Sequence, residues 1–293
     1  MAVNFLNVKC IQCLVNKSIA DLPDVSEEKK VAYIKRVLSV IANAAESSSA
    51  PEAVEEITKA QREIFGTAKD YGEEKKYYND LLLSVKDDIK EKIISAADPF
   101  VSAMNYSFAG NYIDFGTVNG VDREKLINLL DSAGDISVSP AETENLRREI
   151  KDAHKLVYLI DNCGEVVLDR LFIEEIKRQN PRLDVTVITR GAPVLNDCTK
   201  EDACSVGLDL AAHIVSNGTA VAGTCLDRIA PAAREAIDNA DVIISKGQGN
   251  FETLIGCKKN VYYLFLCKCE KFSDRFGVKN MSAMLVNDKR LEL

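Results

Sequence analysis

The sequence lacks the features of a membrane or secreted protein. No apolar run approaches the roughly 20 residues needed to span a bilayer. The opening stretch, MAVNFLNVKC, has no apolar core of the kind found in signal peptides. We therefore expect a cytoplasmic protein with no membrane partner.

Positively charged residues are also outnumbered by negatively charged ones. The chain carries 37 Lys and Arg against 45 Asp and Glu, a net charge of -8. Proteins that bind nucleic acid need a positive field to neutralise phosphates, so this balance argues against a nucleic-acid partner. A small phosphorylated ligand is still compatible with it, because a few local cations and a metal can outweigh the global field.

Histidine and complete nucleotide-binding motifs are nearly absent. The only histidines are His154 and His213, and His213 begins an apolar run, which predicts a core position rather than a ligand. The best match to G-x-G-x-x-G is completed by Glu252 and follows the fourth predicted strand, which argues against a dehydrogenase. No Walker A loop is present. General-base chemistry by histidine is therefore poorly supported.

The first half of the chain has helical periodicity. Of the 293 residues, 46% are hydrophobic and 28% charged, which allows a substantial core and suggests two domains. Ser26 is a plausible N-cap for a first helix, Pro51 suits the first turn of a second, and a third follows Gly72. We predict an all-helical domain over residues 1–150.

From about Lys155 the pattern changes to short apolar runs of strand length separated by helical stretches. The predicted strands are Val157–Ile160, Val185–Thr189, His213–Val215, Val242–Ser245 and Val261–Leu266. Strands that alternate with helices indicate a parallel sheet covered on both faces. We predict an α/β fold, doubly wound and mostly parallel, over residues 151–293.

Polar residues follow each predicted strand, where open α/β sheets bind their ligands. Asp161 and Asn162 follow the first strand, and Asp197 lies in the loop after the second. Their oxygen atoms suit Mg²⁺ or Mn²⁺. Lys246 and Lys268 follow the fourth and fifth strands and can neutralise phosphate oxygens. Together these residues form the usual set of groups for phosphoryl transfer.

Each of these residues also has a simpler interpretation. An Asp-Asn pair at a strand end is often only a helix cap, and a lone lysine is usually solvated. Their joint occurrence at successive strand ends favours a site. Phosphatases that use an aspartyl nucleophile usually have a second Asp two residues on, and Cys163 occupies that position here. We therefore interpret Asp161 as a metal ligand rather than a nucleophile.

The nine cysteines include one C-x-x-C pair, Cys10 and Cys13. Reduced, mostly buried thiols are the simpler interpretation. Cys267 and Cys269 offer two more thiols that only a tertiary contact can bring to this pair. A thiol-based metal or redox protein therefore remains an alternative, which elemental analysis tests.

Several segments together resemble the damage-control phosphatases, formerly domain of unknown function 89. The segments are 161–165 (DNCGE), 193–197 (PVLND), 246–252 (KGQGNFE), 109–116 (AGNYIDFG) and 268–270 (KCE). They occur in the same order over nearly the whole chain. Cys10 and Cys13 resemble a feature of the stand-alone microbial subfamily.

This resemblance implies a helical domain beside a Rossmann-like domain and a hydrolase that removes phosphate from small metabolites such as sugar phosphates. It implies metal ligation by Asp161, Asn162 and Asp197, with magnesium, manganese, cobalt or nickel as the cofactor. It implies contacts to phosphate or substrate by Lys246, Asn250 and Lys268, with Asn111 and Asp114 where the helical domain meets the site. The main rival is a protein that binds a phosphometabolite or nucleotide without turning it over.

Overall fold

The computed structural model describes residues 6–114 and 122–291. Phe115 and Gly116, which belong to one of the resembling segments, lie outside these residues. Six strands form one sheet in the order β3-β2-β1-β4-β5-β6. The strands are β1 (Lys155–Leu159), β2 (Asp184–Thr189), β3 (His213–Ser216), β4 (Val242–Lys246), β5 (Val261–Leu266) and β6 (Ala283–Asn287). All neighbours pair in parallel except β5 and β6, which are antiparallel.

The predicted α/β class and all five predicted strands are confirmed, and β6 is an additional edge strand. The described helices are α1 (Val8–Ala20), α2 (Glu27–Ala42), α3 (Ala50–Phe65), α4 (Gly72–Ser95), α5 (Pro99–Gly110), α6 (Arg123–Asp131), α7 (Pro140–Asp152), α8 (Glu165–Gln179), α9 (Lys200–Ser205), α10 (Pro231–Asp238), α11 (Gly247–Leu254) and α12 (Glu270–Phe276). None of the described helices is long and apolar enough to cross a membrane.

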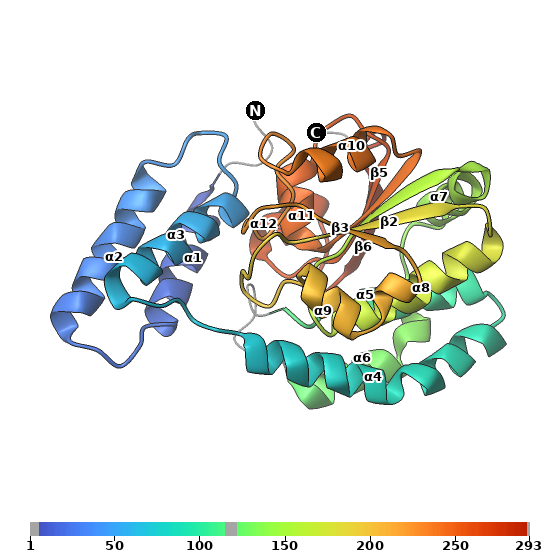
Figure 1. Cartoon of the computed structure of the whole chain (residues 1–293), viewed down its shortest axis with the longest axis horizontal. Helices are drawn as coiled ribbons and strands as arrows, with labels where there is room; N and C mark the ends of the chain where they lie inside the picture. The colour runs from blue at the N-terminus through green and yellow to red at the C-terminus, as the bar shows by residue number, and fades with distance from the viewer. Residues whose placement is uncertain (1–5, 115–121, 292–293) are drawn as a thin grey trace.

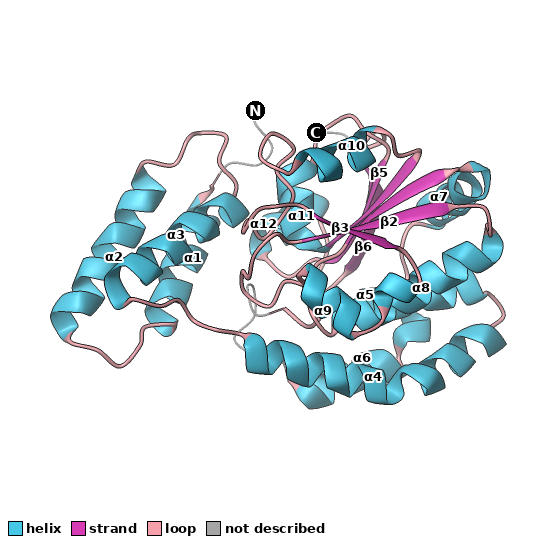
Figure 2. Cartoon of the chain, in the orientation of Figure 1, coloured by secondary structure: helices cyan, strands magenta, loops and turns pink. Residues whose placement is uncertain are grey.

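Helices cover both faces of the sheet (Figures 1 and 2). Leu156 and Tyr158 of β1 point into one core with helices α4, α5, α7 and α8. Val157 and Leu159 point to the opposite face, into a second core with α10, α11 and α12. Because successive strand side chains alternate between faces, one strand serves both cores. The sheet is therefore doubly wound.

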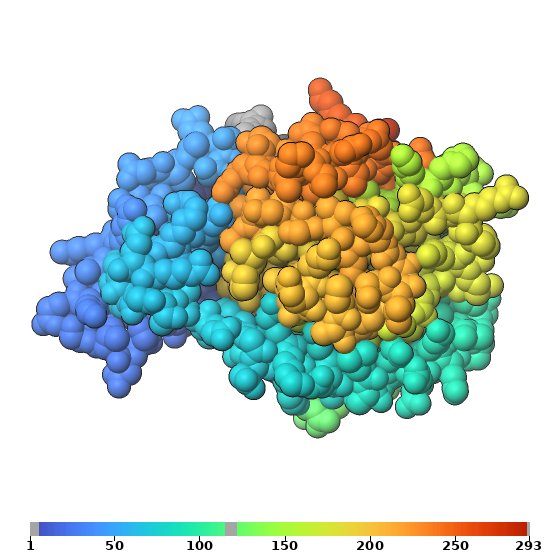
Figure 3. Space-filling view, viewed as in Figure 1, coloured from blue at the N-terminus to red at the C-terminus, as the bar shows by residue number. Residues whose placement is uncertain are grey.

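Helices α1–α3 form a lobe with its own small core around Tyr33 and Val37. Figure 3 shows this lobe, in blue, against the body that contains the sheet. Ser49 and Glu52 form a capping box at the start of α3, where Pro51 occupies the first turn as predicted. Lys9 of α1 forms ion pairs with residues of α12, and α3 packs on α11.

The packing divides the chain at a different place from the predicted boundary at residue 150. Residues of α4, α5 and α7, such as Leu82, Phe108 and Leu146, share one core with the sheet. Among the described residues, helices α1–α3 have a core that contains no strand of the sheet. The reason is that α5 is buried almost all round and packs directly on α8. Helical periodicity shows that these helices exist but does not show which surface they cover.

Candidate active site

The candidate site lies at the carboxyl ends of β1 and β4, where the strand order reverses. This switch point is where doubly wound sheets bind ligands. A cavity of about 480 Å³ opens there, and Asp161, Asn162 and Asp197 line it. The structure therefore brings together the three residues that we expected to hold a metal.

The loops after β1 and β2 are joined through their backbones. Asn162 and Asp197 form an isolated antiparallel bridge. The Cys163 amide donates to the Asn196 carbonyl at 2.9 Å, and the Cys198 amide donates to the Asp161 carbonyl at 2.7 Å. These bonds fix the spacing between the two loops that carry the carboxylates.

Arg190 joins the loops after β1 and β2 to helix α11 beneath the cavity. Its side chain is completely buried. Its Nε donates to Asp197 Oδ2 at 2.6 Å, its Nη2 to Asp161 Oδ1 at 3.1 Å and its Nη1 to Asn250 Oδ1 at 3.0 Å. A guanidinium is the one side chain that offers this rigid fork of donors. The sequence analysis assigned Arg190 no role, although a cation directly after a buried strand was a usable signal.

Two amide side chains orient the carboxylates from the other side. Asn162 Nδ2 donates to Asp161 Oδ2 at 2.8 Å and to Glu165 Oε2 at 3.1 Å. Asn111 Nδ2 donates to both Glu165 oxygens, at 2.9 and 3.0 Å, while Asn111 Oδ1 accepts from the Leu266 amide. The amide group of Asn162 is thereby turned so that its Oδ1 has no donor among the described residues.

Lys246 lies beneath the cavity rather than on its surface. Its ammonium is fully buried and contacts Glu165 Oε1 at 2.6 Å, Asp169 Oδ1 at 2.8 Å and Ser107 Oγ at 2.6 Å. All of its charge is therefore matched within the protein. This position favours a role in holding Glu165 rather than the direct phosphate contact that we expected.

Asn250 and Asn111 are also buried under the site. Asn250 Oδ1 accepts from Arg190 and from Thr224 Oγ1, and its Nδ2 donates to the Lys246 carbonyl. Neither of these described residues, nor Lys246, lines the cavity. Hydrogen bonds that hold the loops together account for their positions, so we assign them positioning roles.

Removal of the Lys246 charge is expected to destabilise the fold. In Lys246→Met the buried Glu165 and Asp169 lose the one cation that they share among the described residues, which should cost about 3–5 kcal/mol of unfolding free energy. Urea denaturation measures this. Lys76→Met removes an exposed pair with Asp80 and should leave the midpoint unchanged. Equal midpoints for Lys246→Met and wild type would contradict the buried network.

Lys268 and Asp114 line the cavity as a pair. Lys268 Nζ lies 2.8 Å from Asp114 Oδ2. The Lys268 backbone amide donates to Gln248 Oε1, which fixes the start of this loop. Of the five residues expected to contact phosphate or substrate, these two line the cavity.

The site holds more buried negative charge than its cations neutralise. Five carboxylates belong to the connected network, against three cations. The carboxylates are Asp114, Asp161, Glu165, Asp169 and Asp197, and the cations are Arg190, Lys246 and Lys268. A divalent cation balances this difference, and oxygen donors suit hard metals. The residues present therefore fit a divalent metal.

The pKa values of Asp161 and Asp197 reflect their burial and the negative charges around them. Burial raises the pKa of Asp161 well above 3.8, and the negative charges of Asp197 and Glu165 raise it further. Burial raises the pKa of Asp197 to about 6, although Arg190 opposes the shift. Without a cation the site therefore favours protonation of Asp161, and of Asp197 below a pH of about 6.

The backbone around these groups is closely fitted. Gly247 has a φ of 77°, and a Cβ at this position would lie 1.8 Å from Asp161 Oδ2. Only glycine satisfies both conditions. Leu195, two residues before Asp197, also has a positive φ, of 46°. Such strain at a non-glycine residue is typical of functional loops.

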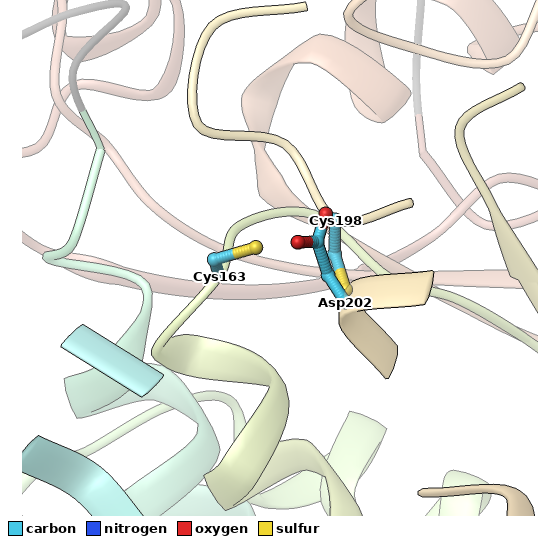
Figure 4. Close-up of side chains that lie close together, drawn as sticks. All are labelled: Cys163, Cys198 and Asp202. Atoms are coloured by element: carbon cyan, nitrogen blue, oxygen red, sulfur yellow. The ribbon is translucent and has the colours of Figure 1, made fainter. Parts of the chain in front are cut away.

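Behind the loops lies a cluster of Cys163, Cys198 and Asp202, whose ligand atoms lie within 4.8 Å of one another (Figure 4). It is the one group of three or more Cys, His, Asp or Glu residues in the described chain that meets this spacing. Asp202 Oδ2 already forms an ion pair with Lys75 and caps α9 by accepting from the Thr199 amide. These partners favour a structural role for Asp202.

The thiols of Cys10 and Cys13 line the cavity together with Cys269. Their ligand atoms do not form a group of three within 4.8 Å of one another among the described residues, so the cavity does not assemble a larger thiol site. Burial raises the pKa of the thiols of Cys10 and Cys13, and that of Cys269 to about 11. These thiols stay protonated at neutral pH without a metal. His213, expected in the core, is instead exposed at the start of β3.

Comparison with known proteins places this geometry in a family. Residues 6–284 match the model of the damage-control phosphatase ARMT1-like domain. A damage-control phosphatase of Archaeoglobus fulgidus is 31% identical over 220 residues, 74% of this chain and 75% of that protein. An uncharacterised protein of Methanocaldococcus jannaschii is 27% identical over 285 residues, 92% of this chain and 91% of its own.

The fold is also that of a solved structure. A DUF89 family protein from Pyrococcus horikoshii superposes with a TM-score of 0.82 at 24% identity, and the match covers 97% of this chain and 99% of that one. The resemblance suggested by the sequence segments is thus confirmed by a match over nearly the whole chain. The protein belongs to the damage-control phosphatase ARMT1-like domain family.

Proposed function

We propose that this protein is a divalent-metal-dependent phosphatase that hydrolyses small phosphorylated metabolites, such as sugar phosphates. The observation that carries the proposal is the excess of buried negative charge around Asp161 and Asp197, whose side chains line an open cavity. Two relatives that are named damage-control phosphatases, from Archaeoglobus fulgidus and Pyrococcus horikoshii, support the reaction class.

Asp161, Asn162 and Asp197 would hold the metal, for which magnesium, manganese, cobalt and nickel are the candidates. When bound, the ion would supply charge neutralisation at the phosphoryl oxygens and would lower the pKa of a coordinated water. Arg190 holds both carboxylates in place through charge-assisted hydrogen bonds. The ligand geometry therefore depends on the guanidinium as much as on the aspartates.

The other residues of the site bind the substrate, orient the attacking water or position the metal ligands. Lys268 donates to a phosphoryl oxygen when a substrate competes with Asp114 for its ammonium. A carboxylate oxygen of Asp161 or Asp197 helps to orient the attacking water, since both side chains line the cavity. Glu165 accepts a hydrogen bond from Asn162 Nδ2, and Lys246 holds Glu165 through an ion pair. Together they fix the orientation of the Asn162 amide group.

The test is phosphate release from an aryl phosphate and from sugar phosphates, with Mg²⁺, Mn²⁺, Co²⁺ or Ni²⁺ and with chelator. We expect release that depends on metal. Thermal stabilisation by a phosphometabolite without any release of phosphate would instead support the rival binding function.

The metal requirement should rise as the pH falls. Asp197 has a pKa of about 6 in the metal-free protein, and the pKa of Asp161 is also raised, so a metal must displace protons to bind. We expect the metal concentration for half-maximal activity to rise as the pH is lowered through about 6. Activation curves between pH 5 and 8 measure it, and a pH-independent requirement would contradict these carboxylates as ligands.

The same pKa shifts predict how the metal-free fold responds to pH. The folded protein binds the Asp197 proton more tightly than the unfolded chain, because the folded pKa is the higher one. This contribution is present below the unfolded pKa of about 4 and is lost as the pH rises through about 6. Added metal should reverse that loss.

A further inference from the structure

Two buried thiols lie directly behind the candidate active site. Cys163 follows Asn162 in the loop after β1. Cys198 follows Asp197 in the loop after β2. Because neighbouring residues of extended backbone point to opposite sides, the bridge between Asn162 and Asp197 turns both cysteines away from the cavity, and neither lines it. The backbone pairing that spaces the two loops therefore also brings the two thiols together.

Asp202 of α9 adds a carboxylate to these thiols. The Sγ atoms of Cys163 and Cys198 and one Asp202 oxygen lie within 4.8 Å of one another, and in Figure 4 an oxygen of Asp202 points toward Cys163. Asp202 uses Oδ2 for its contacts with Thr199 and Lys75, and its Oδ1 accepts no hydrogen bond from the described residues. The carboxylate can therefore keep these structural contacts and still offer a ligand atom.

The charges of this cluster suit a divalent ion bound by two thiolates. Asp202 already balances the ammonium of Lys75. A divalent ion that binds both cysteine side chains releases their two thiol protons, so the net charge of the buried cluster does not change. Sulfur ligands select zinc and other soft ions over magnesium or manganese. Packing of thiols as small apolar groups would not require a carboxylate beside them.

A second cavity gives an ion and a water molecule a path to this cluster. It has a volume of about 640 Å³ and is lined by Lys75, Thr199 and Asp202, together with residues of the α1–α3 lobe. Zinc sites with three protein ligands take a water as the fourth ligand. Zinc–sulfur bonds of about 2.3 Å place two sulfur atoms about 3.8 Å apart, so the three ligand atoms need to contract by about 1 Å at most.

We propose that Cys163, Cys198 and Asp202 form a second metal site, which binds zinc or a similar thiophilic divalent ion behind the candidate active site. The ion ties the loop after β1 to the loop after β2 from the side opposite the cavity, and it holds α9 through Asp202. This site is distinct from the oxygen ligands proposed in the cavity, and its occupancy does not depend on the phosphatase reaction.

Titration of the metal-stripped, reduced protein with cobalt tests this site. Thiolate-to-cobalt charge transfer absorbs in the near ultraviolet, whereas cobalt held by oxygen ligands in the cavity gives no such band. We expect a band that saturates at about one cobalt per chain and that added zinc removes. Cys163→Ala/Cys198→Ala should abolish the band. Asp202→Asn should keep it but require at least about 10-fold more cobalt, because a ligand should matter at least as much as the groups that orient ligands.

Cys10→Ala/Cys13→Ala is the matched control, because these two thiols line the cavity instead. It should keep the whole band. Circular dichroism checks that each variant is folded, and if Cys163→Ala/Cys198→Ala does not fold, the cobalt affinity of Asp202→Asn decides. No band in wild type, the same band in Cys163→Ala/Cys198→Ala, loss of the band in the control, or an unchanged affinity in Asp202→Asn would overturn this inference. Phosphate release is not measured here, so none of these outcomes bears on the phosphatase function.

Discussion

Asp161→Asn should lose at least about 100-fold in metal-stimulated phosphatase activity while it stays folded. The substitution keeps the shape of the side chain but removes the charge shared between Arg190 and the metal. Even residues that only orient metal ligands are worth about 10–100-fold, so a ligand should exceed that range. Measurement of kcat/KM over a metal titration checks the prediction.

Asp209→Asn is the control, because Asp209 is exposed in a short helical turn outside the cavity. It should keep wild-type activity. The melting temperature of metal-free Asp161→Asn should lie within a few degrees of wild type, since burial disfavours the ionised Asp161 in any case. Full metal-stimulated activity in a folded Asp161→Asn protein would remove Asp161 from the site.

Gly247→Ala should be almost as damaging, although glycine carries no functional group. The added Cβ would lie 1.8 Å from Asp161 Oδ2, so either the loop or the carboxylate must move. A displacement of about 1 Å at a catalytic group can cost about 100-fold in rate. We expect a loss of about that size in kcat, together with weaker metal binding.

Gly66→Ala separates backbone strain from the clash with Asp161. Gly66 has a φ of 83°, close to that of Gly247, but a Cβ there meets nothing within 4 Å. Both variants should lose about 1 kcal/mol of stability from the left-handed backbone conformation, and Gly247→Ala should lose more because of its clash. Only Gly247→Ala should lose activity. Equal activities in the two variants would show that the fit of Gly247 against Asp161 is irrelevant to function.

The strands were predictable because their apolar runs are continuous. In β5 every residue from Val261 to Leu266 is buried, as expected for a strand covered on both faces. Strand β6 was missed because Ala283, Met284 and Val286 are only half-buried at the sheet edge, which leaves a short and weak pattern. For the helices, periodicity shows that α5 has apolar faces without showing that α8 covers them.

The residues on the surface of the site were more predictable than those beneath it. Asp161 and Asp197 follow strands directly, and the parallel sheet brings strand ends together. Arg190 was assigned no role because its function depends on reaching Asn250, 60 residues away in sequence. Lys246 also follows a strand, yet its side chain turns inward to Asp169. Position after a strand does not tell which way a side chain points.

Helix α1 is a second example of positions whose surroundings the sequence does not show. Cys10 and Cys13 drew attention as a pair of thiols, whereas Gln12 and Asn16 carry no motif. Only the packing of the α1–α3 lobe against α12 shows that all four line the same cavity as Asp161.

The most direct test of this account is phosphate release by the purified, metal-stripped protein as Mn²⁺ is added back. We predict negligible release from 4-nitrophenyl phosphate and the sugar phosphates without metal. Phosphate release should then rise to saturation in wild type. Release by Asp161→Asn should not rise in this way at the same metal concentrations. Equal release with and without metal, or the same metal response in Asp161→Asn, would contradict a metal site at Asp161, Asn162 and Asp197.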